Sequence, residues 1–170
     1  MKKNKSPSQW VGLKFFSVYG PNEYHKESGQ SLVAQAYPHA AKEKSFTLFK
    51  SENDNYKDGE QMRDFVYVND CVDVVLWFLK NKNVNGLYNV GTGTPRTFYD
   101  VAISVYKSIG IEPKIKYDDM PSELLSKYQY FAQADIKSLR NAGYTKPFTS
   151  LEDGVRDYVI NYLHTSDPYK

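Results

Sequence analysis

Short apolar blocks alternate with blocks of mixed polar and apolar residues along this chain of 170 residues. Short unbroken apolar runs are typical of buried strands, whereas apolar residues that recur every three or four positions are typical of amphipathic helices. Strands are therefore expected at 10–19, 46–49, 65–68, 87–90 and 114–117. Helices are expected at 30–42, 71–81, 98–109, 121–126, 135–142 and 151–163. Because strands and helices alternate along the sequence, the pattern predicts an α/β architecture.

Local signals refine several of these elements. Pro38 should kink the helix at 30–42 or end its first half, because proline lacks an amide donor. Apolar residues run almost all the way round the helix at 71–81, so that helix is expected to lie sandwiched between other elements. Polar residues predict loops at 22–29 and 50–62. Helix caps are expected at Asn69, at Thr97 and in the capping box formed by Thr149 and Glu152.

Composition indicates one folded unit. A hydrophobic content of 41% and an aromatic content of 15% fit a globular protein and argue against disorder. The length suits one domain, which we place at 10–166, after a flexible leader at 1–9 and before a tail at 167–170. The net charge is +2, but three of the 22 basic residues lie in the leader, so no basic stripe for nucleic acid is expected.

Residue usage excludes further classes of site. One cysteine cannot form an internal disulfide, and three scattered histidines offer no metal-ligand spacing. Cys71 lies in an apolar helix, where a buried and inert thiol is expected. The basic leader continues into polar residues, so it is not a secretory signal. No stretch approaches the ~20 apolar residues of a membrane span, and a cytoplasmic location follows by default.

The loop after the first strand is a candidate for chemistry. It runs from Ser17 to Ser28 and brings Lys26 and several hydroxyls close to a strand end. Open α/β sheets bind their ligands at the carboxyl ends of the strands. A lysine held there can act as an acid or a base if burial or a cationic neighbour lowers its pKa. The alternative is a lysine in a solvated loop.

Two further candidates concern nucleotide binding. Arg63, together with the segment 49–52, suits a pyrophosphate, because a guanidinium donates two parallel hydrogen bonds to phosphate oxygens. The alternative is a turn at Arg63 and Asp64 with surface salt bridges. Tyr128 could stack on a nucleotide or bond to it through its hydroxyl, and the alternative is a tyrosine that packs in the core.

Other motifs argue against catalysis by these residues alone. The run from Gly91 to Arg96 is not a dinucleotide fingerprint, because Pro95 and Arg96 replace residues that would let the backbone approach a pyrophosphate. We expect a simple turn there. None of the 15 tyrosines has a lysine four residues later, so the Tyr-x-x-x-Lys pair of dehydrogenase chemistry is absent. The chain also has no Gly-x-Ser-x-Gly nucleophile elbow and no Walker loop.

Five segments carry a resemblance to a known family. They are Gly12-Leu-Lys-Phe-Phe-Ser-Val-Tyr-Gly-Pro-Asn-Glu-Tyr-His-Lys, Arg63-Asp-Phe-Val-Tyr-Val-Asn-Asp, Tyr88-Asn-Val-Gly-Thr-Gly, Tyr128-Gln-Tyr-Phe-Ala-Gln-Ala-Asp and Ala142-Gly-Tyr-Thr-Lys-Pro-Phe. From residue 10 to about residue 162 the chain resembles the C-terminal half of the ADP-L-glycero-D-manno-heptose 6-epimerases, which are extended short-chain dehydrogenase/reductases. The resemblance implies a substrate-binding domain plus the last strands of a Rossmann sheet, with the cofactor-binding half absent.

The resemblance also implies an activity and a site. The activity is NADP-dependent epimerisation of an ADP-sugar, which supplies ADP-heptose for the lipopolysaccharide inner core. Lys26 corresponds to a catalytic lysine and, with Val18, to a cofactor contact. The residues implied to line the ADP-sugar site are Ser17, Ser28, Gln35, Phe49, Lys50, Ser51, Glu52, Arg63 and Tyr128. The chain departs from the family at Ser17, where asparagine is usual, and at Gln35, where some members have histidine.

Several interpretations stay open at this point. We favour a part of a heptose epimerase that is inactive alone, because the residues present offer no seat for a hydride acceptor. The alternatives are a non-enzymatic nucleotide-sugar-binding module, another nucleotide-sugar epimerase or dehydratase, and an unrelated α/β module that associates with a partner chain. The strands at 10–18 and 87–90 should expose apolar surface, so self-association into a homo-oligomer is also expected.

Overall fold

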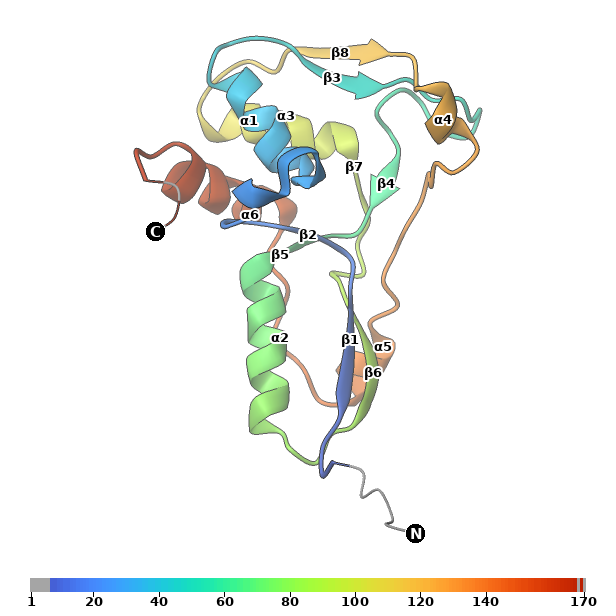
Figure 1. Ribbon diagram of the computed structural model, residues 1–170, viewed down its shortest axis with the longest axis vertical. Coiled ribbons are helices and arrows are strands. Elements are labelled where there is room, and N and C mark those ends of the chain that lie inside the picture. The colour runs from blue at the N-terminus through green and yellow to red at the C-terminus, as the bar shows by residue number, and fades with distance from the viewer. Residues whose placement is uncertain (1–6, 168, 170) are drawn as a thin grey trace.

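The computed structural model describes residues 7–167 and 169, which form an α/β fold (Figure 1). The strands are β1 (Val11–Phe15), β2 (Ser17–Tyr19), β3 (Phe46–Phe49), β4 (Met62–Arg63), β5 (Phe65–Tyr67), β6 (Gly86–Val90), β7 (Arg96–Thr97) and β8 (Ile115–Asp118). The helices are α1 (Leu32–Ala40), α2 (Val68–Lys80), α3 (Phe98–Ser108), α4 (Ser122–Leu125), α5 (Lys137–Asn141) and α6 (Leu151–Tyr158), with a 3-10 helix η1 (Tyr24–Gly29) and a π-helix η2 (Val159–Leu163). The predicted alternation of strands and helices is confirmed. Leader residues 1–6 lie outside the described part, and the proposed domain boundaries stay a prediction.

The described strands pair in four two-stranded sheets. β1 lies parallel to β6, β2 parallel to β5 and β3 parallel to β8, while the short β4 and β7 are antiparallel. Figure 1 shows β1, β6, α2 and α5 in the lower part of the molecule and β3, β8, α1 and α3 in the upper part. The paired strands β2 and β5 lie where the two parts meet.

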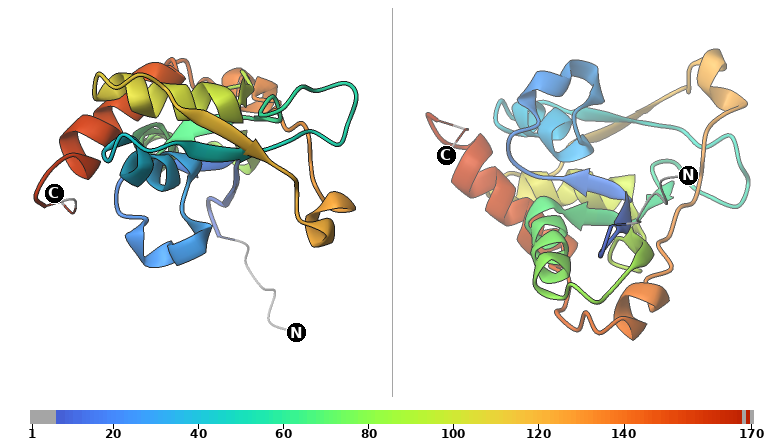
Figure 2. Two further views of the ribbon diagram at one scale, coloured as in Figure 1. Left: turned by 90° about the horizontal axis from the view of Figure 1, so that it is seen from above. Right: turned by 60° about the horizontal axis from the view of Figure 1, so that its bottom comes forward.

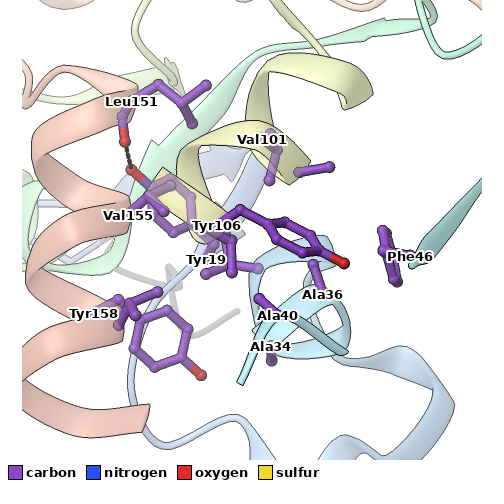
Figure 3. Packing of buried hydrophobic residues seen from close by; sticks show 14 of the residues in the cluster. Tyr19, Ala34, Ala36, Ala40, Phe46, Val101, Tyr106, Leu151, Val155 and Tyr158 are labelled. Carbon is purple, nitrogen blue, oxygen red and sulfur yellow. Dashed lines mark hydrogen bonds between the residues drawn. The ribbon is translucent and has the colours of Figure 1, made fainter. Parts of the chain in front are cut away.

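The core of the upper part lies between α1, α3 and α6. These helices contribute small and β-branched residues that pack around buried tyrosines (Figure 3). Tyr19, Tyr106 and Tyr158 are almost completely buried, and the Tyr19 hydroxyl donates to the Leu151 carbonyl at 3.4 Å. Both views in Figure 2 place α6 beside α3. The upper part therefore has its own hydrophobic core, which holds β2 and β5 from one side.

A second, smaller core lies in the lower part. Cys71 and Val74 of α2 pack there with Val90 of β6 and Leu139 of α5. The prediction of a buried Cys71 is confirmed. Burial, with a smaller contribution from the nearby Asp70 carboxylate, raises the pKa of the Cys71 thiol to about 12, so the thiol stays protonated and unreactive near neutral pH.

One face of α2 has no cover among the described residues. Val72, Val75, Leu76 and Leu79 repeat at helical spacing and are 49%, 38%, 46% and 61% exposed. The expectation that this helix is sandwiched is therefore wrong for the described part of the chain. A groove of about 250 Å³ runs between this face and β1, with apolar residues from both elements in its walls.

The first predicted strand is two strands that belong to different sheets. Phe16 separates β1 from β2. Its amide still donates to the Val90 carbonyl of the β1–β6 sheet, whereas the Ser17 amide donates to the Asp64 carbonyl beside β5. The expectation of one buried strand is also wrong at its start, because Trp10 is 55% exposed beside a sheet that has only two strands here.

Helix starts were predicted with mixed success. Thr97 caps α3 in a capping box with Asp100, as expected. Asn69 is not a cap, because α2 already begins at Val68. At the last helix the prediction is wrong by one residue: Ser150 accepts from the Asp153 amide, and Thr149 donates to Asp70 instead.

Two other local expectations also need correction. The loop at 22–29 contains the 3-10 helix η1. Pro38 lies inside α1, which continues to Ala40, so the proline does not end the helix; a kink at Pro38 stays a prediction. An internal proline removes one backbone hydrogen bond, and burial of Val33, Ala36 and Ala40 in the upper core holds the helix together across it.

Candidate functional site

A cavity of about 450 Å³ opens in the upper part, and we call it the Arg63 cavity. Its walls come from β2, α1, β3, β4, β5 and the start of α3. Six predicted site residues lie in these walls: Ser17, Val18, Gln35, Phe49, Arg63 and Tyr128. The structure therefore brings together residues that are far apart in the sequence: candidates proposed from local chemistry, such as Arg63 and Tyr128, and Gln35, which only the family resemblance implied.

Arg63 is the main charged group of this cavity. Its guanidinium carbon lies 5.5 Å from the ring centre of Phe98 and 5.8 Å from that of Tyr128. Its Nη1 donates to the Met62 carbonyl at 2.8 Å, and it makes no ion pair with a carboxylate in the described residues. Desolvation by burial lowers the pKa of Arg63 from its ordinary value, but an arginine keeps its charge in proteins. A half-buried cation without an anionic partner is suited to an anionic ligand.

Tyr128 adds an unused polar atom to the same cavity. Its ring meets Phe49 edge to face, with centroids 6.5 Å apart. Its hydroxyl oxygen is buried and has no hydrogen-bond partner in the described residues. Desolvation raises the pKa of Tyr128, although the nearby Arg63 charge opposes that shift. A protonated phenol is therefore available to donate to a ligand oxygen.

Three predicted residues lie after β3 and outside the walls of the Arg63 cavity. The Lys50 ammonium pairs with Asp119 at 2.8 Å on the surface. The Ser51 hydroxyl donates to the Asn53 carbonyl, and the Glu52 amide donates to the Tyr130 hydroxyl at 2.9 Å. Their predicted role at the ADP-sugar site stays a prediction. The side chain of Ser28 lies outside the described part of the structure.

Lys26 lies at a second cavity of about 450 Å³, which we call the Lys26 cavity. Its walls also include Glu23, Asn69 and Tyr162. Val18 lines both cavities. The predicted catalytic lysine and five of the predicted nucleotide-sugar residues therefore line two cavities that share Val18 as a wall residue.

The glycine turn after β6 is already occupied by a carboxylate. Asp64 is fully buried, and its oxygens accept from the amides of Thr92 and Gly93, from the Thr92 hydroxyl and from the Ala134 amide at 2.7–3.0 Å. Glycine loops bind dinucleotides by donating hydrogen bonds from backbone amides to the pyrophosphate. The amides of this turn already donate to Asp64, so they are not free to do so. The turn at Gly91 is therefore not a phosphate site of that kind.

Sequence reasoning missed several residues of the Arg63 cavity. The missed residues are Ser31, Leu32, Phe46, Thr47, Leu48, Phe65 and Phe98. Phe98 had a usable signal, because it follows the Thr97 cap directly and so lies at the first turn of a helix. The others are ordinary strand or helix residues, and only the pairing of distant elements brings them to the cavity.

Two other classes of site find no support in residues 7–167 and 169. No group of three or more His, Cys, Asp or Glu side chains is arranged to hold a metal ion there. Every helix in that part of the chain is too short or too polar to cross a bilayer.

Comparison with known proteins decides the family. The sequence model of the NAD dependent epimerase/dehydratase family matches residues 3–91, which is more than half of the chain. The chain belongs to this family. It is 50% identical over 159 residues to an ADP-L-glycero-D-manno-heptose-6-epimerase of Nitratidesulfovibrio vulgaris (strain DP4), covering 94% of this chain and 49% of that relative.

Solved structures of epimerases have the same fold. A crystal structure of Helicobacter pylori ADP-L-glycero-D-manno-heptose-6-epimerase matches with a TM-score of 0.71 and 31% identity, over 90% of this chain and 44% of that one. The UDP-glucose 4-epimerase of Thermus thermophilus, in complex with NAD, matches with a TM-score of 0.70 and 27% identity, over 89% of this chain and 45% of that one. The predicted resemblance and fold class are confirmed. The chain spans about half the length of the curated relative it matches.

Proposed function

We propose that this chain supplies the nucleotide-sugar-binding part of an ADP-L-glycero-D-manno-heptose 6-epimerase. In this proposal the enzyme uses NADP and makes ADP-heptose for the lipopolysaccharide inner core, in the cytoplasm. The observation that carries the proposal is the Arg63 guanidinium, which is half-buried beside a 450 Å³ cavity without an ion pair in the described residues. The 50% identity to a heptose epimerase supports the same substrate class.

Arg63 would bind the pyrophosphate of the ADP-sugar. The rings of Phe98 and Tyr128 both lie within 6 Å of the guanidinium carbon and would restrict its rotation, so less side-chain entropy would be lost when two parallel hydrogen bonds to phosphate oxygens form. Because the guanidinium is partly desolvated, its attraction to a phosphate is screened less than at an open surface.

Other side chains would orient the rest of the ligand. The buried Tyr128 hydroxyl lacks an acceptor among the described residues, and leaving such a donor unpaired costs roughly 1–3 kcal/mol. A ligand oxygen in the Arg63 cavity would remove that cost. The Phe49 ring and the Ser17 hydroxyl lie in the same walls, so they can offer an apolar contact and a hydrogen bond to the nucleoside and the sugar.

Lys26 would exchange a proton with the sugar on one face. Bound nicotinamide would supply the reversible hydride acceptor that epimerisation at the sugar carbon needs. Val18 lines both cavities, so it could contact both a sugar held at Arg63 and the cofactor. We infer that Val18 and Lys26 contact the dinucleotide without holding it alone, because Asp64 occupies the amides of the glycine turn.

Calorimetry tests the proposal with ADP-heptose, ADP and UDP-glucose as titrants. ADP-heptose and ADP should bind to the unaltered chain, and Arg63→Ala should weaken both by ~1–3 kcal/mol, as expected for a charged hydrogen bond. Arg156→Ala is the matched control, because Arg156 is exposed. Absence of heat with both adenine nucleotides would end the proposal, and equal binding of UDP-glucose would favour another nucleotide-sugar epimerase.

A further inference from the structure

The loop that carries Lys26 is closed by a buried carboxylate. Glu23 is only 4% exposed. One of its oxygens accepts from the Ser31 amide at 2.6 Å, and the other accepts from the Ser31 hydroxyl at 2.5 Å. Ser31 is also the N-cap of α1, where its hydroxyl oxygen accepts from the Ala34 amide. Glu23 therefore connects the start of the loop to the start of the helix that follows it.

Further hydrogen bonds lie inside the loop that this contact closes. The Gln30 side-chain amide donates to the Tyr24 carbonyl at 3.0 Å, and the Lys26 amide donates to the Glu23 carbonyl at 3.0 Å. Glu27 then adopts a backbone φ of 47° with ψ of −117°. Residues other than glycine seldom adopt that backbone conformation, and it persists only where surrounding contacts impose it. The residue directly after Lys26 is thus held in an unusual conformation by a closed loop.

The Lys26 side chain itself has no such anchor. The ammonium is exposed, and in the described residues it makes no hydrogen bond or ion pair. Its place at the Lys26 cavity is therefore set by the backbone that carries it. Glu23 lines the same cavity as Lys26. The carboxylate that closes the loop therefore lies near the lysine that the loop carries.

We propose that Glu23 is a positioning residue, which clasps the loop at 23–31 through Ser31 and so fixes Lys26 beside Val18. The functional importance of the clasp rests on the role proposed for Lys26. The clasp itself can be tested on the full chain without catalysis. A role limited to stabilising α1 is the competing explanation, and the test must separate the two.

A nitroxide spin label at residue 26 measures the motion of the loop directly. Lys26→Cys provides the attachment site, and Cys71 does not compete because its thiol is buried and has a pKa of about 12. A second label, on His39→Cys, reports on α1, where His39 is exposed. Spectra are recorded with Glu23→Ala, Glu23→Gln and Glu27→Gln in each background. Glu27 is the matched control, since it lies in the same loop and is exposed.

The clasp predicts a specific pattern. Glu23→Ala should shorten the rotational correlation time of the label at residue 26 by about two-fold or more, into the range of mobile loops. The rotational correlation time of the label at residue 39 should stay unchanged. Glu23→Gln should stay close to the unaltered chain, because its oxygen can accept from the Ser31 amide and its amide can donate to the Ser31 hydroxyl. Glu27→Gln should have no effect.

Other outcomes overturn the proposal. An unchanged spectrum at residue 26 in Glu23→Ala shows that the clasp does not hold the loop. An equal gain in motion at residues 26 and 39 shows that Glu23 only stabilises α1. If Glu23→Ala does not fold, Glu23→Met, which fills similar space but has no strong acceptor, decides in its place, and an unchanged spectrum at residue 26 again overturns the proposal. Failure of the proposed function would appear separately, as absence of ADP-heptose binding in the unlabelled chain.

Discussion

Replacing Asp64 by asparagine should destabilise the fold strongly, because four donors converge on this buried carboxylate. One oxygen accepts from the amide and hydroxyl of Thr92, and the other accepts from the amides of Gly93 and Ala134. Asparagine keeps one oxygen and replaces the other by an amino group that cannot accept. With the oxygen turned toward Thr92, the Gly93 and Ala134 amides face another donor and lose their acceptor.

The magnitude follows from those two amides. Each buried donor left without an acceptor costs roughly 1–3 kcal/mol, so the variant should lose about 2–6 kcal/mol of unfolding free energy. Domains of this size are stable by only about 5–15 kcal/mol, so the loss is a large fraction of the total. The cost arises in the folded state alone, because water solvates both side chains when the chain unfolds.

Urea unfolding followed by tryptophan fluorescence measures this loss. The midpoint should fall while the slope of free energy against urea stays constant, because the same surface is exposed on unfolding. Asp54→Asn is the matched control: it makes the same chemical change at an exposed position. A loss of less than about 1 kcal/mol in Asp64→Asn would refute the reasoning, since a single unsatisfied amide should cost more than that.

Three other predictions concern reactivity, pH and association. Cys71 should react with a thiol reagent far more slowly in the folded chain than in urea, because burial raises its pKa to about 12; equal rates by absorbance would contradict this. The hydrogen bond from Arg96 lowers the pKa of Glu152 in the folded chain. The Arg96–Glu152 pair therefore stabilises the fold fully above the ordinary carboxylate pKa of about 4.3, and this stabilisation is lost as pH falls through the lower pKa of the folded chain. Arg96→Gln should weaken that acid dependence of the urea midpoint, and an unchanged dependence would refute it. The exposed face of α2 should drive concentration-dependent self-association in light scattering, and Leu76→Lys combined with Leu79→Lys should reduce it; a monomer at every concentration would rule this out.

Local signals in the sequence were sufficient for much of the fold. Thr97 and Asp100 satisfy each other's backbone amides within one turn, so the start of α3 can be predicted from residues three apart. The Thr149 prediction failed for the opposite reason. Thr149 binds Asp70, which is distant in the sequence, and that contact moves the cap to Ser150.

Long-range contacts also explain what could not be predicted at the site. Arg63 and Tyr128 were identified from the sequence, but nothing there indicated that the Phe98 ring would also lie within 5.5 Å of the guanidinium carbon. Pro95 and Arg96 alone predict that the turn at Gly91 does not bind a dinucleotide. The Asp64 carboxylate, which occupies the amides of that turn, is 28 residues or more away in the sequence, so this contact is visible only in three dimensions.

The switch of the chain from one sheet to another at Phe16 limits how this segment can change in length. Only that residue separates β1 from β2. A single inserted residue there would turn every following side chain of β2 to the opposite face, which would move Ser17 and Val18 out of the cavity walls they line. The surface segment at 53–58 has no such restriction, because added residues there can bulge into solvent at little entropic cost. Engineered tags or reporter peptides should therefore be tolerated between β3 and β4 and rejected at Phe16.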